Sequence, residues 1–268
     1  MFRKLAALFK RDFYINASYK LSFLIGWMNT LAVLLPFFFV ARLFGKGSSP
    51  YLLPYGGDYF SFVLIGIGLR RYLSHAVNSL AGTIGYEQSL GTLEVLFVSP
   101  TPFRQVFFLL SLLSFIYATG NFLFYLFLGT FLFQVPFPQA NFAGALVVLP
   151  LTLLTFYSFG LLSASFILVF KKQNPIEPFF EGFSSFLGGV YFPVTLLPSW
   201  LQKVSDILPM TYGLRALRLC LLKGATLVSL GKDLLILSLL TLLLFPISVW
   251  IFGKSLKKAK KDGSLIHY

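Results

Sequence analysis

The sequence predicts an all-α integral membrane protein with six transmembrane helices. Of its 268 residues, 57% are hydrophobic and only 12% are charged, and the mean hydropathy is +0.80. A soluble globular domain carries about 25% charged residues. Crossing a bilayer takes about 20 mainly apolar residues, and six segments within 21–253 meet this need. They are Leu21–Phe44, Tyr59–Ala81, Phe103–Phe133, Phe142–Phe170, Phe179–Leu197 and Asp233–Phe252.

Residues 1–20 precede the first span and predict an amphipathic helix in the membrane interface. Their apolar residues recur at helical spacing, and the basic residues lie off that stripe. The stripe consists of Phe2, Leu5, Ala6, Phe9 and Phe13. Membrane lipids would be its partners, and a disordered basic tail is the alternative. The run that follows is longer than the apolar part of a signal peptide, so we expect it to be a retained span.

The distribution of Lys and Arg predicts the orientation. With a cytoplasmic N-terminus, thirteen of the 22 basic residues fall on the inner side, seven on the outer side and two inside a span. Inner loops of membrane proteins carry this excess. We therefore expect a plasma (inner) membrane protein with both termini cytoplasmic and a basic cytoplasmic tail over 254–268. Basic flanks beside spans contact anionic lipid, so the net charge of +13 does not predict a nucleic-acid partner.

No pattern in the sequence predicts an enzyme. The two histidines, His75 and His267, are far apart, and the chain lacks H-E-x-x-H, C-x-x-C and G-x-S-x-G. The tripeptide Gly253–Ser255 ends like a P-loop, but the glycine required five residues earlier is Ser248. We expect no metal or cofactor in this chain. If ATP drives it, a second polypeptide supplies the nucleotide site.

The stretch between the second and third spans predicts a short cytoplasmic helix over about 85–99. Its carboxylates lie on one helical face and its apolar residues on a neighbouring face. The first face holds Glu87, Gly91 and Glu94, and the second holds Leu90, Leu93 and Phe97. Pro100 ends the helix. Such a helix is suited to docking into a groove of a partner with basic rims, whereas the alternative is a solvated loop.

A region of broken helices is predicted on the outer side, over about 193–223. Pro193, Pro198 and Pro209 interrupt half-length apolar runs, and lipid cannot satisfy the backbone groups that proline frees. We expect the fifth span to end near Pro193. Two short helices, about 198–207 and 211–222, would then dip back from the outer face, with Trp200 and Tyr212 as interface anchors.

Arg70, Arg71 and His75 fall near the middle of the second span. A charge at the bilayer centre costs about 2.5–3.5 kcal/mol. Arg71 and His75 are four residues apart and share a face. The functional hypothesis is that this face lines the translocation path and meets an anionic group such as a phosphate or a carboxylate. Snorkelling, pairing with a carboxylate on another helix, or a shifted span are the alternatives.

Two motifs resemble those of the type-2 ATP-binding-cassette (ABC) exporter permeases, and the resemblance covers essentially the whole chain. The stretch "YEQSLGTLEVLFVSP" resembles the coupling segment of that family, in which the matching residues are Glu87, Gly91, Thr92, Glu94, Leu96, Ser99 and Pro100. The stretch "YFPVTLLPSWLQKVSDILPMTYGLRALR" resembles the second family signature. There the matching residues are Phe192, Pro193, Leu197, Pro198, Trp200, Leu201, Pro209, Thr211, Tyr212, Ala216 and Arg218.

The resemblance implies the transmembrane subunit of an ABC exporter for a hydrophobic or amphipathic substrate, drug-like or lipidic. It implies a dimer of two such chains, or of this chain with a closely related permease, and a separate P-loop ATPase that holds ATP and Mg. Gly91 and Thr92 would shape the coupling helix. Tyr86 and Gln88 stand where the family has basic residues, so contacts through those charges are in doubt. An exporter of lipid-linked polysaccharide, a secondary carrier or channel, and a structural membrane subunit remain as alternatives.

Overall fold

The structure is a computed structural model that describes residues 20–45, 49–89, 103–170, 178 and 180–261. This described part of the chain is helical and contains no strand. Five long helices form its frame, and they agree with the predicted class. They are α2 (Lys20–Phe44), α3 (Tyr59–Ser89), α5 (Phe103–Phe131), α6 (Phe142–Phe170) and α11 (Gly231–Lys261).

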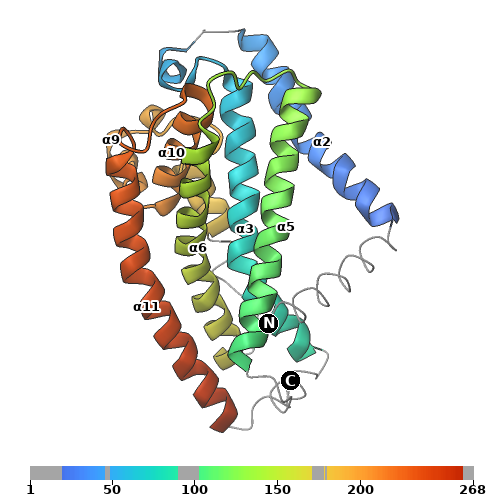
Figure 1. Ribbon diagram of the computed structural model, residues 1–268, viewed down its shortest axis with the longest axis vertical. Helices are drawn as coiled ribbons and strands as arrows, with labels where there is room; N and C mark the ends of the chain where they lie inside the picture. Colours follow the sequence, from blue (N-terminus) through green and yellow to red (C-terminus); the bar gives the residue numbers. More distant parts are fainter. Residues whose placement is uncertain (1–19, 46–48, 90–102, 171–177, 179, 262–268) are drawn as a thin grey trace.

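The helix bundle is organised around α6 (Figure 1). Helix α6 packs against α3 on one side and α11 on the other, and α3 also packs against α5. Small residues allow helix backbones to approach closely inside a membrane. Gly160 shows this, since a Cβ atom there would lie 2.7 Å from the backbone oxygen of Ala76 on α3. Helix α2 contacts α3 and leans away from the other helices along its length (Figure 1).

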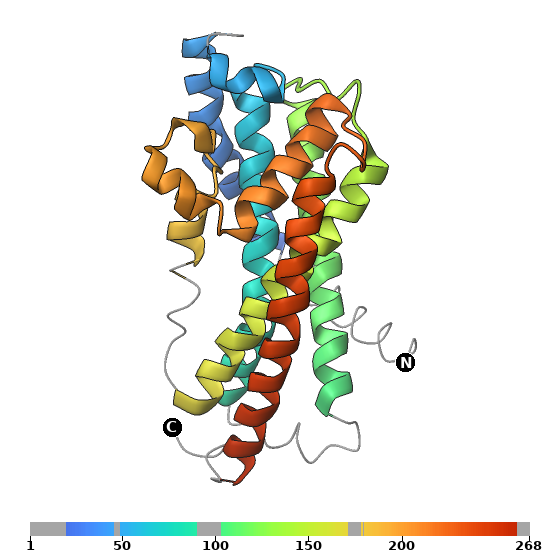
Figure 2. The same ribbon diagram turned by 90° about the vertical axis from the view of Figure 1, so that its left-hand side faces the viewer.

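Short helices gather at one end of the bundle, the upper end in Figures 1 and 2. A 3-10 turn, η1 (Pro50–Tyr55), precedes α3. The chain before α11 forms a π-helical turn, η2 (Phe180–Ser184), then α8 (Ser185–Leu187), η3 (Val194–Leu196), α9 (Ser199–Ser205) and α10 (Pro209–Lys223). The last two agree with the two short helices predicted over 198–207 and 211–222, while their re-entry from the outer face stays a prediction.

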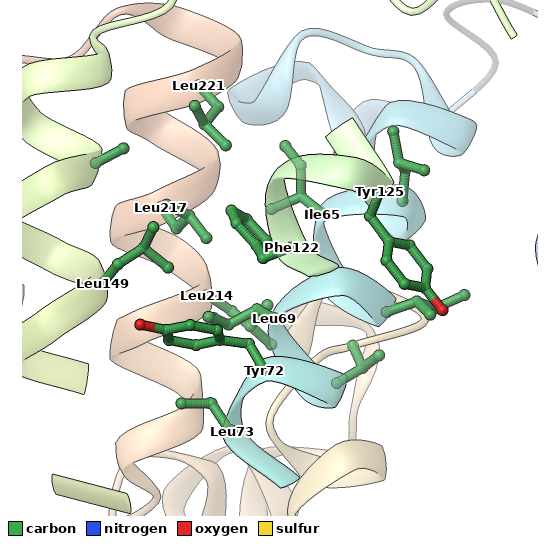
Figure 3. Packing of buried hydrophobic residues seen from close by; sticks show 14 of the residues in the cluster. Ile65, Leu69, Tyr72, Leu73, Phe122, Tyr125, Leu149, Leu214, Leu217 and Leu221 are labelled. Carbon is green, nitrogen blue, oxygen red and sulfur yellow. The ribbon is translucent and has the colours of Figure 1, made fainter. Parts of the chain in front are cut away.

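The main hydrophobic cluster lies where α3, α5, α6 and α10 meet (Figure 3). Ile65, Leu69 and Leu73 of α3 face Leu214 and Leu217 of α10 within it. Between membrane helices such side chains stabilise the fold mainly through van der Waals packing. A smaller cluster joins α3 to α6 further along both helices. Helix α3 is therefore held along its length by two separate cores.

Three helices are long and apolar enough to cross a membrane among the residues that the structure describes: Ser111–Phe131, Phe142–Phe170 and Gly231–Ala259. The apolar part of α2, Met28–Leu43, is shorter, and α3 carries two arginines near its middle. Six spans therefore remain a prediction.

The structure differs from the predicted boundaries in three places. Helix α3 continues past Ala81 to Ser89, because no proline interrupts it. The described part of the predicted fifth span is helical only to Leu187, since the chain turns at Gly189, where φ is +81° and only glycine fits easily. Helix α11 extends to Lys261, so the predicted basic tail begins as part of a helix.

Candidate functional site

A cleft of about 280 Å³ lies between α2, α3 and α5. The predicted pair Arg71 and His75 lines it together, four residues apart on α3, as the helical spacing predicted. Thr30 contributes from α2, and Asn121 and Tyr125 contribute from α5. Three helices thus bring polar groups to one place inside an otherwise apolar bundle.

The guanidinium of Arg71 stacks near an aromatic ring of the neighbouring helix. Its Cζ atom lies 5.7 Å from the centroid of the Tyr125 ring, which is within the range of a cation–π contact. Tyr125 itself is 3% exposed. Its hydroxyl group is buried and has no hydrogen-bond partner among the described residues. The cleft therefore holds a cation and an unused polar group side by side.

The depth of the cleft along α3 follows from helix geometry. At 1.5 Å per residue, Arg71 lies about 18 Å from the start of α3 at Tyr59 and about 27 Å from its end at Ser89. The cleft therefore opens near the middle of the helix, far from either end.

Arg70 does not belong to this cleft. It is adjacent to Arg71, but neighbouring residues of a helix point about 100° apart, and Arg70 is not among the lining residues. Its Nε atom is buried without a hydrogen-bond partner in the described part of the chain. The structure therefore separates the three residues predicted for the translocation path into a pair that meets at the cleft and one that does not.

At the end of the bundle with the short helices, Arg218 of α10 is 3% exposed. Its guanidinium donates hydrogen bonds to three backbone oxygens: Phe62 at 3.1 Å, Gly189 at 2.8 Å and Val190 at 2.9 Å. It also lies over the Phe62 ring, 3.4 Å from the centroid. Burial lowers the pKa of Arg218 to about 9, so the group stays charged at neutral pH. Arg218 therefore ties α10 to α3 and to the turn that follows α8.

A second arginine of α10 pairs with the start of α11. Arg215 donates to both carboxylate oxygens of Asp233, with Nε at 2.9 Å and 3.1 Å. These hydrogen bonds raise the pKa of Arg215. Sequence reasoning placed Asp233 at the start of the sixth span and gave it no partner. The two residues are 18 positions apart, so no local pattern revealed the pairing.

The other predicted residues of the outer region shape the short helices. Pro193 and Pro198 immediately precede η3 and α9, and Pro209 begins α10, where a missing N–H costs nothing. The Tyr212 hydroxyl donates to the backbone oxygen of Asp206 at 2.6 Å, which closes the turn between α9 and α10. Trp200 is 65% exposed, and its role as an interface anchor stays a prediction.

The predicted coupling segment falls largely outside the described residues. Leu90, Gly91, Thr92, Leu93, Glu94, Phe97 and Pro100 lie there. Glu87 lies on the last turns of α3. Helix α3 thus runs without interruption from the end of the bundle with the short helices, past the cleft, into the first residues of the stretch predicted as a separate helix.

Long apolar helices that surround a polar, cation-bearing cleft are typical of a multi-pass membrane protein. The chain belongs to the ABC-2 type transporter family, whose model matches residues 3–222. It is similar to the inner membrane transport permease YadH of Escherichia coli strain K12, with 26% identity over 164 residues, which is 61% of this chain and 63% of the relative. The YadH protein of Shigella flexneri matches with the same identity and coverage. The alignment thus spans about 63% of the length of these curated relatives.

Proposed function

We propose that this chain is the transmembrane subunit of an ATP-driven exporter. Its substrate would be a hydrophobic or amphipathic molecule, drug-like or lipidic, that leaves the cytoplasm or the inner leaflet. The chain itself would not be an enzyme, because ATP and Mg would bind a separate P-loop ATPase. Two such chains, or this chain and a closely related permease, would form the membrane unit in the inner membrane, with both termini cytoplasmic.

The observation that carries this proposal is the family match over residues 3–222. The path of α3 supports it mechanically. One continuous helix contains Arg71 and His75 at the cleft and Glu87 next to the predicted coupling segment. A displacement of that segment by an ATPase would reach the cleft through a helix that is packed on both α5 and α6.

The proposed coupling residues divide by chemistry. Glu87 and Glu94 would form polar contacts with the ATPase, and Leu90, Leu93 and Phe97 would enter its groove. Gly91, Thr92 and Pro100 would fix the shape and the end of the segment. Because Tyr86 and Gln88 replace basic residues of the family pattern, the apolar side would carry more of this contact.

The test is ATP hydrolysis by the complex of this chain with its ATPase in lipid nanodiscs, compared with transport by the same complex. We expect Glu94→Ala to weaken, and Gly91→Pro to abolish, the stimulation of ATP hydrolysis by substrate. Coupled transport that is undiminished in both variants would remove the coupling role. Transport by this chain without any ATPase would instead indicate a secondary carrier or a channel.

A further inference from the structure

We propose that the cleft between α2, α3 and α5 binds the anionic group, a phosphate or a carboxylate, of an amphipathic molecule. The inference rests on the proposed function in one respect, because it names the substrate class of that transporter. The ligand would be a membrane phospholipid or another amphipathic anion, with its charged group against Arg71 and its apolar part outside the cleft.

Charge balance is the first argument. A cation near the middle of a membrane helix is costly unless an anion accompanies it. The sequence has no Asp or Glu between Asp58 and Glu87, none in α2, and none between Glu94 and Glu177, which includes all of α5 and α6. Glu87 is 16 residues from Arg71, about 24 Å along α3. No helix that lines the cleft therefore offers Arg71 a carboxylate, and a bound anion would supply the missing charge.

The remaining polar groups of the cleft fit an anionic oxygen. His75 carries a ring N–H, and the exposed side chain of Asn121 carries two amide N–H groups. The buried Tyr125 hydroxyl has no partner among the described residues and is free to donate. Donors from α3 and α5 thus line the same cleft as Arg71, and hydrogen bonds to ionised groups are the strong ones.

The size and lining of the cleft indicate an amphipathic ligand. A whole drug-sized molecule occupies a pocket of about 300–1,000 Å³, so about 280 Å³ suits one polar group of a larger molecule. Part of the lining is apolar, with Ala118, Phe122 and Phe124 of α5 beside the polar groups.

The experiment measures lipid binding to the full-length chain in detergent by native mass spectrometry, without any ATPase. Phosphatidylglycerol is compared with zwitterionic phosphatidylcholine, and inorganic phosphate is added as a competitor. We expect the wild-type chain to prefer phosphatidylglycerol, and Arg71→Gln to bind it about tenfold more weakly, because one charge-assisted contact is lost. Competition by phosphate would assign the site to free anions as well, and its absence would assign it to lipid headgroups.

Arg70→Gln is the matched control, because it removes the same charge at the same depth outside the cleft. It should bind phosphatidylglycerol like the wild-type chain. Tyr125→Phe keeps the ring beside Arg71 and removes only the hydroxyl, so it tests the site if Arg71→Gln does not fold. We expect it to weaken binding severalfold. Equal binding of the two lipids to the wild-type chain, or an equal loss in Arg70→Gln, would overturn the proposal.

The result is independent of ATP coupling. Because no ATPase is present, a failure to select the anionic lipid removes the anion site and leaves the ATP-driven function to the hydrolysis assay. The opposite result would be selective binding of phosphatidylglycerol together with normal substrate-stimulated ATP hydrolysis in the Gly91→Pro complex. It would support the anion site and contradict the coupling role.

Discussion

The Nε atom of Arg218 donates a hydrogen bond to the backbone oxygen of Phe62, 3.1 Å away, while the guanidinium lies over the ring of the same residue. This contact joins two residues that are 156 positions apart in the chain. It fixes α10 against α3 and, through Gly189 and Val190, fixes the turn after α8. The end of the bundle with the short helices therefore depends on one buried cation.

We expect Arg218→Met to destabilise the chain by about 2–4 kcal/mol, because three buried backbone oxygens lose a charged donor. The stability of Arg218→Lys should lie between that of the wild-type chain and that of Arg218→Met. Lysine keeps the charge, but its ammonium group cannot reproduce the planar fork of donors. The midpoints of thermal unfolding in detergent, monitored by size-exclusion chromatography, rank the stability of the variants. Arg42→Met is the control, because Arg42 is exposed and only stacks on Phe38. Equal midpoints for Arg218→Met and the wild-type chain would contradict this account.

Gly66→Ala should also destabilise the chain. A Cβ atom at Gly66 would overlap the backbone oxygen of Val190 and come within 2.6 Å of an Arg218 nitrogen. Overpacking of this kind costs about 1–3 kcal/mol. Gly82→Ala on the same helix meets nothing within 4 Å, so it should stabilise α3 by up to about 1 kcal/mol. Opposite shifts of the unfolding midpoint are the expected result, and shifts of the same sign would count against the contact.

Asp233→Asn should weaken the attachment of α10 to α11, because it removes the charge that faces Arg215. We expect a loss of about 1–2 kcal/mol, since the Arg215 side chain is 35% exposed and solvent screens the pair. The reversed pair Arg215→Asp with Asp233→Arg should recover part of the loss in the same unfolding assay. The loss of stability in the double variant is compared with the summed losses of the single variants Arg215→Asp and Asp233→Arg. If the double variant loses as much as that sum, the two residues do not interact as described.

Gly82→Pro should separate ATP hydrolysis from transport. Proline removes a helical hydrogen bond and kinks the helix, and Gly82 lies on α3 between the cleft residue His75 and Glu87, which is predicted to contact the ATPase. Substrate-stimulated hydrolysis should fall at least severalfold, while Gly82→Ala should behave like the wild-type chain. The rates of ATP hydrolysis with and without substrate are measured on the complex in nanodiscs. Unchanged stimulation in Gly82→Pro would show that α3 does not transmit the motion.

Periodicity and turn chemistry predicted the local elements well. The bounds of α6 agree with the predicted segment, and the two short helices, predicted from about 198 and 211, begin at Ser199 and Pro209. The continuation of α3 to Ser89 was missed, because the span and the stretch from about residue 85 were predicted as two separate helices. The turn at Gly189 was missed because it depends on distant groups, Arg218 among them.

The candidate site was only partly visible from the sequence. The spacing of Arg71 and His75 correctly predicted a shared face. Nothing in the sequence indicated which of the two adjacent arginines, Arg70 or Arg71, meets a cleft. That choice depends on Tyr125 and Asn121 of α5 and on Thr30 of α2, which tertiary packing brings to α3. The Arg215–Asp233 and Arg218–Phe62 contacts likewise join distant positions, so local patterns did not reveal them.

ATP-dependent movement of substrate tests the central claim most directly. The chain is reconstituted in proteoliposomes with its P-loop ATPase, and the movement of a fluorescent anionic lipid is followed with ATP, without ATP, and with an ATPase whose P-loop lysine is replaced. We predict movement only with ATP and the intact ATPase, and a strong reduction in Gly91→Pro. Movement at the same rate without ATP, or with the inactive ATPase, would contradict an ATP-driven exporter.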